Sequence, residues 1–364
     1  MRITSLTLRS FRSYETLTID FGESGRPEIF IGENGTGKTN IVEAVSLLSL
    51  GRSCLRADQE TMLRFGHDFF RVRADIQTDD GAAKSVECVF QTSPRRASAY
   101  FVQDARTPLL NFIGVLPSIT FLPQDLDLFT GSPSGRRNVI DALLSQLQPT
   151  YAERRLSYEK VLKQRNALLR RIAEGESPSS DLDVWDAELS LHGTGIRRER
   201  AKVLESFSRM LPAELRSLSE SPATLTVRSS IGSGDLAADL QHSRAKDILL
   251  RTTTVGPHRD DWTILADDHP IGDYYSRGQQ RSAFLALLFV SASLFEAHRN
   301  ERPVILLDDV LSELDDAHQQ ALLRRLEGHQ VLLTTTHPIP QITGLRTWAV
   351  RGEGIVETAT ADVA

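Results

Sequence analysis

The chain has 364 residues, a formal net charge of −6, 40% hydrophobic residues and 25% charged residues. This length suits two domains, or one domain with a large insertion, and the composition excludes a mostly disordered chain. Two cysteines are too few for a disulfide framework, and no apolar run is long enough for a signal peptide or a membrane span, so we expect a cytoplasmic protein without a membrane partner.

The first part of the chain alternates apolar and polar residues, which predicts a pair of strands at residues 3–8 and 16–21. Residues 32–39, Gly-Glu-Asn-Gly-Thr-Gly-Lys-Thr, then fit the phosphate-loop pattern G-x-x-x-x-G-K-[ST]. An apolar run at 28–31 predicts a strand before the loop, and residues 40–45 open a helix after it. Glycines let backbone N–H groups face a phosphate, and the helix N-terminus adds its positive dipole end. The stretch therefore predicts a nucleoside triphosphate site.

Lys38 would reach the terminal phosphates and assist catalysis, and the Thr39 hydroxyl would bind Mg²⁺. A glycine-rich turn that binds nothing is the alternative, and the combination of strand, loop, Lys-Thr and helix disfavours it. The residues predicted to bind ATP are Gly32, Glu33, Asn34, Gly35, Thr36, Gly37, Lys38, Thr39 and Asn40.

After the first helix, period-two segments at 69–76, 85–90 and 97–102 predict an antiparallel sheet, and residues 118–122 predict a buried strand. From residue 135 to 218 the apolar period becomes helical, with a long helix at 151–173 and an antiparallel partner from 181 onward. We therefore predict three segments. They are a segment with the phosphate loop and the β segments at 1–134, an inserted helical domain at 135–218, and a segment with the later motifs at 219–364.

Two motifs follow the insertion. Ser276, Arg277, Gly278 and Gln279 begin a predicted helix and offer a hydroxyl, N–H groups and a dipole end to a phosphate. Because the chain already has a phosphate loop, this second anion site suits the nucleotide of another subunit. An ordinary turn with an N-cap is the alternative.

The second motif is the apolar strand 304–307, which ends in Asp308 and Asp309. In a phosphate-loop ATPase the first aspartate holds Mg²⁺, and the adjacent carboxylate polarises the attacking water. Many buried strands end in Asp only to cap a loop, which is the alternative here. A later strand, 329–336, delivers His337, and we expect this histidine to contact the γ-phosphate.

The order of these motifs resembles ABC-type ATPases, and their details resemble the RecF family of DNA repair ATPases. The matching segments are 32–40, 48–52, 121–125, 131–133 with 136–137, 256–261, 276–280 and 306–315. The resemblance implies an α/β fold, in which an ABC-type phosphate-loop ATPase head with a mixed sheet and an antiparallel β subdomain carries an inserted helical lid. It also implies a Gln-loop contact to Mg²⁺ at Gln124 and a D-loop with Ser312 and Asp315.

By the same resemblance the protein is a weak Mg²⁺-dependent ATPase that dimerises around ATP and binds DNA without sequence preference. The family acts with RecO and RecR at single-strand gaps, in replication recovery and the SOS response. On an acidic chain the DNA surface must be a local basic patch. The long helix 151–171 has such an excess of basic residues, and a solvated helix face is the alternative. The predicted contacts are Arg154, Arg155, Lys163 and Arg165.

Three other functions remain open at this stage. The nucleotide-binding subunit of an ABC transporter would share the phosphate loop and the carboxylate strand, but the long insertion and Asp309 in place of a glutamate disfavour it. A phosphate-loop kinase would leave residues 276–280 without a purpose. The third alternative is an ATP-switched binding module in which hydrolysis only resets a clamp.

Overall fold

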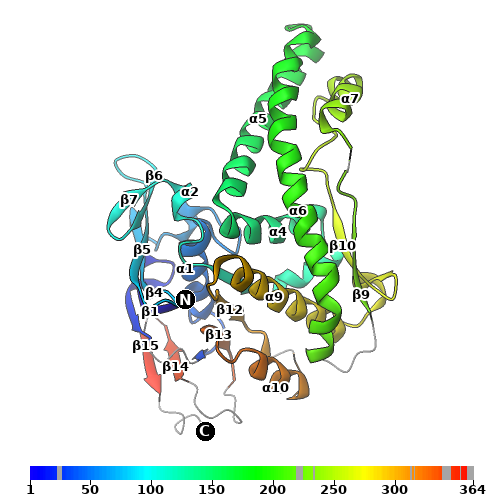
Figure 1. Cartoon of the computed structure of the whole chain (residues 1–364). Coiled ribbons are helices and arrows are strands. Elements are labelled where there is room, and N and C mark those ends of the chain that lie inside the picture. The colour runs from blue at the N-terminus through cyan, green and yellow to red at the C-terminus, as the bar shows by residue number, and fades with distance from the viewer. Residues whose placement is uncertain are drawn as a thin grey trace. The chain divides into compact units, whose positions relative to one another are not determined.

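The chain folds into two compact units (Figure 1). In the computed structural model the described residues, apart from the side chains at 316 and 317, are 1–22, 27–218, 224–232, 234–311, 314, 316–337, 346–352 and 354–358. Unit 1 comprises Met1–Leu126, Ala213–Pro222 and Ser276–Ala364. Unit 2 comprises Asp127–Pro212 and Ala223–Tyr275.

Unit 1 contains a six-stranded antiparallel sheet with the order β2-β1-β4-β5-β6-β7. Its strands are β1 (Arg2–Phe11), β2 (Tyr14–Asp20), β4 (Phe69–Gln77), β5 (Ala83–Gln91), β6 (Ala97–Val102) and β7 (Ala105–Thr107). Leu6, Leu8 and Val72 are buried on one face, whereas Arg9 and Arg71 are exposed on the other. The alternation in the sequence therefore predicted this β subdomain correctly.

The second sheet of unit 1 has the order β15-β14-β3-β13-β12-β8. Its strands are β3 (Glu28–Ile31), β8 (Ser118–Phe121), β12 (Val304–Asp308), β13 (Val331–Thr335), β14 (Arg346–Arg351) and β15 (Gly354–Thr358). Neighbouring strands are parallel except for the antiparallel pair β14–β15. The predicted mixed sheet is confirmed, and its parallel strands all end at one edge.

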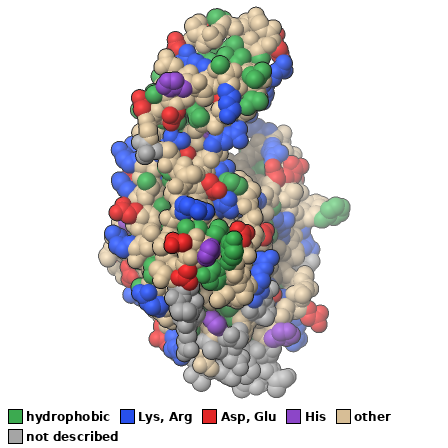
Figure 2. Space-filling view, turned by 90° about the vertical axis from the view of Figure 1, so that its right-hand side faces the viewer, with side chains coloured by type: hydrophobic (Ala, Val, Ile, Leu, Met, Phe, Trp, Pro, Cys, Tyr) green, Lys and Arg blue, Asp and Glu red, His purple; other side chains and the backbone are tan. Residues whose placement is uncertain are grey.

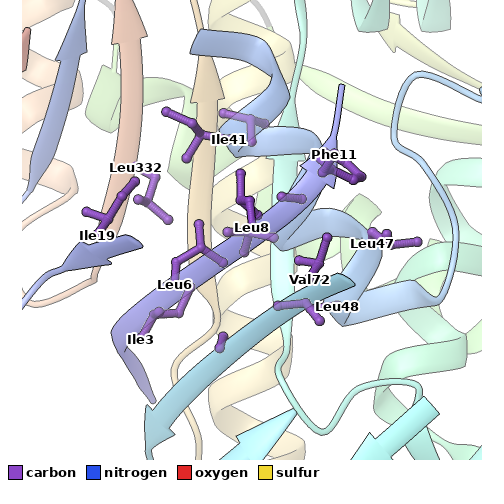
Figure 3. Packing of buried hydrophobic residues seen from close by; sticks show 14 of the residues in the cluster. Ile3, Leu6, Leu8, Phe11, Ile19, Ile41, Leu47, Leu48, Val72 and Leu332 are labelled. Atoms are coloured by element: carbon purple, nitrogen blue, oxygen red, sulfur yellow. The ribbon is translucent and has the colours of Figure 1, made fainter. Parts of the chain in front are cut away.

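Helix α1 (Lys38–Leu50) packs against strands of both sheets, so its apolar residues face two layers at once. Figure 3 shows Ile41, Leu47 and Leu48 of this helix among side chains of the antiparallel sheet and Leu332 of β13. Each such side chain, when fully buried, stabilises the fold by about 1.5–3 kcal/mol. The other helices of unit 1 are η1 (Gln59–Met62), α2 (Leu109–Phe112), η2 (Pro123–Leu126), α9 (Arg277–Arg299) and α10 (Asp316–Arg325).

Unit 2 is built around two long helices, α5 (Pro149–Ala173) and α6 (Leu182–Leu218), of which α6 continues into unit 1 beyond Pro212. A small antiparallel sheet has the order β11-β10-β9. Its strands are β9 (Leu225–Ser229), β10 (Trp262–Ala266) and β11 (His269–Pro270). The remaining helices are α3 (Asp127–Thr130), α4 (Pro133–Leu147), η3 (Ser179–Asp181), α7 (Leu236–Leu250) and α8 (Ile271–Tyr274).

The predicted lid at 135–218 covers less of the chain than unit 2 does. Part of the segment that we assigned to the C-terminal head also belongs to unit 2. Arg165 of α5 bonds to Asp247 of α7 (2.7 Å), and Arg197 of α6 bonds to Asp260 (2.9 Å). These contacts join residues that are 63 or more positions apart in the chain. Helical periodicity reports only local structure, so it could not reveal them.

Candidate nucleotide-binding site

The phosphate loop runs from the end of β3 into α1, as predicted, and its backbone requires glycine at two positions. Gly37 has a φ of 103°, and a Cβ added there would lie 2.7 Å from Ser13 Oγ and 2.8 Å from Tyr14 Oη. A Cβ at Gly32 would lie 2.5 Å from the Val350 carbonyl oxygen. The turn between β1 and β2 therefore supports the loop, a role of Ser13 and Tyr14 that no sequence pattern indicates.

Lys38 lies inside the curl of this loop. Its Nζ donates to the carbonyl oxygens of Gly32 (2.7 Å) and Glu33 (2.8 Å). Burial lowers the pKa of Lys38, and the nearby carboxylates of Asp309 and Asp308 act in the opposite direction. In the described part of the chain no side chain caps α1, so its first N–H groups remain available. An ammonium group beside these N–H groups fits a triphosphate.

The loop side chains differ in their surroundings. Glu33 and Asn34 are exposed, as is Gly35, whereas Thr36 bonds to the Glu33 carbonyl oxygen (2.9 Å). Asn40 Nδ2 donates to Ser13 Oγ (2.9 Å), which ties α1 to the β1–β2 turn. The loop is therefore fixed at its base, while its tip faces solvent.

Asp308 ends β12 next to the phosphate loop, with 7% of its surface exposed. Thr39 Oγ1 lies 3.0 Å from each of its carboxylate oxygens, and Thr334 Oγ1 donates to Oδ1 (2.6 Å). Burial raises the pKa of Asp308, while the bonds from Thr334 and Thr39 lower it. A hydroxyl beside a carboxylate is a donor set of hard oxygen ligands, which suits Mg²⁺. The predicted metal pair, Thr39 and Asp308, is therefore brought together.

Asp309 follows directly, with a φ of 49° that is uncommon outside glycine. Its backbone N–H donates to the carbonyl oxygen of Thr334 (3.1 Å) and to its Oγ1 (3.0 Å), so β13 holds the turn. Sequence reasoning assigned no role to Thr334, although a threonine on the adjacent strand was the available signal.

Parallel strands bring the other predicted residues to the same edge of the sheet. η2, with the exposed Gln124, follows β8, and the exposed His337 follows β13. The N–H of His337 donates to Thr335 Oγ1 (3.3 Å). The phosphate loop follows β3, and the two aspartates stand at the end of β12. All of these residues therefore lie at one edge of the sheet. Their contacts with nucleotide or metal remain predictions.

The motif at Ser276 starts α9, and all four residues from Ser276 to Gln279 are exposed. Ser276 Oγ accepts from the Gln279 N–H (3.3 Å), and the Ser276 N–H donates to Gln279 Oε1 (2.9 Å). This capping box confirms the N-cap interpretation within one subunit. The predicted D-loop residues Ser312 and Asp315 lie outside the described residues.

The comparisons with known proteins agree with this geometry. The family model of the RecF/RecN/SMC N terminal domain matches residues 2–342. The DNA replication and repair protein RecF of Lachnoclostridium phytofermentans is 33% identical over 92% of this chain and 93% of its own length. The RecF protein of Heliobacterium modesticaldum is 35% identical over 93% of both chains. The chain belongs to the RecF family.

Solved structures agree with this membership. The recombination mediator protein RecF-ATP of the RecFOR pathway is 28% identical, with a TM-score of 0.90 over 98% of this chain and 97% of that chain. The Smc head bound to the C-winged helix domain of ScpA, 16% identical, shares the fold with a TM-score of 0.59 over 99% and 98% of the two chains. This RecF-family chain therefore has the fold of an ABC/SMC-type ATPase head. The transporter alternative is not favoured, and none of the described helices is long and apolar enough to cross a membrane.

The basic residues of α5 separate into different environments. The prediction that Arg165 contacts DNA is wrong, because this side chain is fully buried (0% exposed) and bonds to Asp186 (2.6 Å) and Asp247 (2.7 Å). Arg155 is mostly buried and forms an ion pair with Glu159. Arg154 is half-buried, and Lys163 is exposed.

Arg154 lines a groove of about 610 Å³ together with His192 and Arg198 of α6. A Cβ at Gly195 would lie 3.0 Å from Arg154 Cδ, so this glycine makes room for the arginine against α6. On the face shown in Figure 2, basic and acidic side chains are interspersed. Of the residues predicted on α5, Arg154, Arg155 and Lys163 therefore remain predicted DNA contacts.

Proposed function

We propose that this chain is an ATP-dependent DNA-binding protein of recombinational DNA repair and replication recovery. The observation that supports this function most is the gathering of Lys38, Thr39 and Asp308 at one sheet edge, with Asp309 beside them. The relatives bear the name DNA replication and repair protein RecF. The structures of RecF-ATP and RecF-ATPrS support ATP as the nucleotide.

In the proposed reaction Lys38 and the first N–H groups of α1 bind the phosphates, and Thr39 and Asp308 hold Mg²⁺, with Gln124 as a further contact. The ion would neutralise charge on the phosphate oxygens. Asp309 orients the attacking water, and His337 contacts the γ-phosphate. Correct positioning of a general base contributes roughly 10²–10⁴-fold. Asp309 is one methylene shorter than a glutamate, so we expect slow hydrolysis that serves as a switch.

The exposure of Ser276, Arg277, Gly278 and Gln279 supports a second part of the proposal. Each subunit would present this helix N-terminus to the ATP bound by its partner, so that ATP joins two heads. Ser312 and Asp315 would contribute from the D-loop. The dimer closes on DNA as a clamp at gaps or at junctions of single- and double-stranded DNA, and slow hydrolysis releases it.

ATP would strengthen DNA binding because dimerisation brings two basic surfaces to one duplex. Contacts made mainly to the phosphate backbone give little sequence preference. Since similar structures belong to the RecFOR pathway, we propose RecR- and RecO-like mediators as partners, and a role in the SOS response. The free cysteines Cys54 and Cys88 suit a reducing cytoplasm.

The test is the molecular mass of the protein in solution with ATP, with ADP and without nucleotide, for the parent chain and for Ser276→Arg. We expect a dimer only with ATP, and we expect Ser276→Arg to bind ATP but to remain monomeric and inactive in hydrolysis. Ser180→Arg, on an exposed serine of η3 in unit 2, is the control for an added arginine. A Ser276→Arg protein that still dimerises with ATP would rule out the role of this motif.

A further inference from the structure

Thr334 is a fully buried residue of β13 that lies opposite Asp308 in the register of the parallel sheet. Its Oγ1 is 2.6 Å from Asp308 Oδ1 and 3.0 Å from the backbone nitrogen of Asp309. One hydroxyl group therefore contacts both residues at the end of β12.

The direction of these two bonds follows from the chemistry of the groups. A backbone N–H can only donate, and an ionised carboxylate can only accept, whereas a hydroxyl can do both. The Asp309 N–H must therefore donate to Thr334 Oγ1, and the Thr334 hydroxyl must donate to Asp308 Oδ1. Bonds arranged in such a chain polarise one another and become stronger.

Both aspartates receive contacts from Thr334, and the Asp309 N–H is shared between the Thr334 hydroxyl (3.0 Å) and the Thr334 carbonyl oxygen (3.1 Å). Asp309 has a φ of 49°, a conformation that persists only when surrounding contacts hold it. Within the described chain, the hydrogen bonds to the Asp308 carboxylate come from Thr39 and Thr334. Thr39 is itself an expected Mg²⁺ ligand, so Thr334 is the donor that remains committed to Asp308 when the Thr39 hydroxyl turns to the metal.

We propose that Thr334 is a positioning residue that orients Asp308 toward Mg²⁺ and fixes the backbone from which Asp309 reaches the attacking water. This inference rests on the proposed ATPase function. Thr334 acts through the two aspartates and has no contact with the nucleotide in this role. Loss of a partner that orients a metal ligand typically costs about 10–100-fold in metal affinity or activity.

The test compares Thr334→Val, which keeps the side-chain shape but removes the hydroxyl, with Thr334→Ser, which restores it. The measurements are binding of a fluorescent ATP analogue in EDTA and in a Mg²⁺ titration, the ATPase rate, and the thermal unfolding midpoint. We expect Thr334→Val to bind the analogue normally in EDTA. It should need about 10–100-fold more Mg²⁺ for tight binding, or hydrolyse more slowly by a similar factor. Thr334→Ser should recover both properties.

Thr347→Val is the matched control, because Thr347 is a buried threonine of β14 in the same sheet. It should leave the Mg²⁺ titration unchanged. If Thr334→Val shows the parental Mg²⁺ dependence and rate, or if Thr334→Ser is equally impaired, the hydroxyl has no positioning role. If the parent chain itself fails to bind or hydrolyse ATP, the proposed function fails instead, and the two failures are thus distinct.

Discussion

Unit 2 and the candidate site of unit 1 bury charged groups in different ways. In unit 2, buried arginines meet carboxylates directly: Arg165 bonds to Asp186 and Asp247, and Arg200 donates to both oxygens of Asp141 (2.9 Å each). In unit 1, the buried Lys38 bonds to carbonyl oxygens and Asp308 accepts from hydroxyls. Among the described residues, the hydrogen bonds of Lys38 Nζ go to Gly32 and Glu33 rather than to Asp308.

This difference distinguishes charged groups that stabilise the fold from charged groups that can bind a ligand. In a buried ion pair the two charges compensate each other, and removing one partner leaves an uncompensated charge. A buried ammonium and a buried carboxylate that are held apart keep capacity for phosphate and metal, at the cost of perturbed pKa values. Paired charges therefore stabilise unit 2, whereas separated charges form the candidate site of unit 1.

Asp309→Asn gives the largest expected effect on the functional side of this comparison. ATP binding should persist, while hydrolysis should fall by roughly 10²–10⁴-fold, because the amide cannot act as a base. The ATPase rate at saturating ATP measures this. Asp104→Asn is the control, since Asp104 also has a positive φ (62°) but lies in the turn between β6 and β7. An unchanged rate in Asp309→Asn would show that Asp309 is not the base.

Arg165→Met tests the structural side. Asp247 would remain buried without its cation, and Asp186 would keep only Arg244 (2.7 Å), so we expect a loss of about 3–5 kcal/mol in the free energy of unfolding. Denaturant titration measures it. Lys163→Met, two residues away on the exposed face of α5, should change the unfolding free energy by less than about 0.5 kcal/mol. A stable Arg165→Met protein with weakened DNA binding would reverse our assignment.

Glu28 is a buried carboxylate of unit 1 outside the phosphate loop, and its polar contacts only partly offset the cost of burying its charge. Burial raises the pKa of Glu28 to about 7, although Trp348 donates to it (2.6 Å) and Arg346 lies 3.5 Å away. Since the folded-state pKa lies above the ordinary value of 4.5, Glu28 contributes stability below pH 4.5, and this contribution is lost as the pH rises to about 7.

We expect the loss to amount to about 3 kcal/mol, and Glu28→Gln to remove this part of the pH dependence. Unfolding free energies between pH 4.5 and pH 8 would measure it. Glu357→Gln, which alters the exposed partner of the same Arg346, is the control. Parallel pH profiles for the parent and Glu28→Gln would contradict the prediction.

The smallest expected effect concerns the charges that unit 2 leaves exposed. If Arg154 and Lys163 each neutralise one phosphate of duplex DNA, their joint replacement by Gln should reduce the slope of log K against log salt by about 0.9 for each residue. Unfolding stability should not change. Lys202→Gln, on the exposed side of α6, is the control. An unchanged slope would show that these side chains face solvent and do not contact DNA.

Local sequence patterns were sufficient wherever the chemistry is contained in one short segment. The phosphate loop, the strand ending in Asp308 and Asp309, and the alternating strands of the β subdomain were predicted because backbone geometry and side-chain period fix them locally. The extent of unit 2 and the fate of Arg165 were not, because a run of basic residues on a helix gives no sign of which side chain faces a distant carboxylate.

The sequence by itself therefore determined the phosphate loop, the carboxylate strand and the types of the strands and helices. Only the tertiary structure decided which charges are free to act. Arg165 meets Asp247 across 82 positions of sequence, and Thr334 meets Asp308 across 26, through the packing of separate elements. Burial and partner geometry set the energy of a charge, and both arise only when distant segments come together.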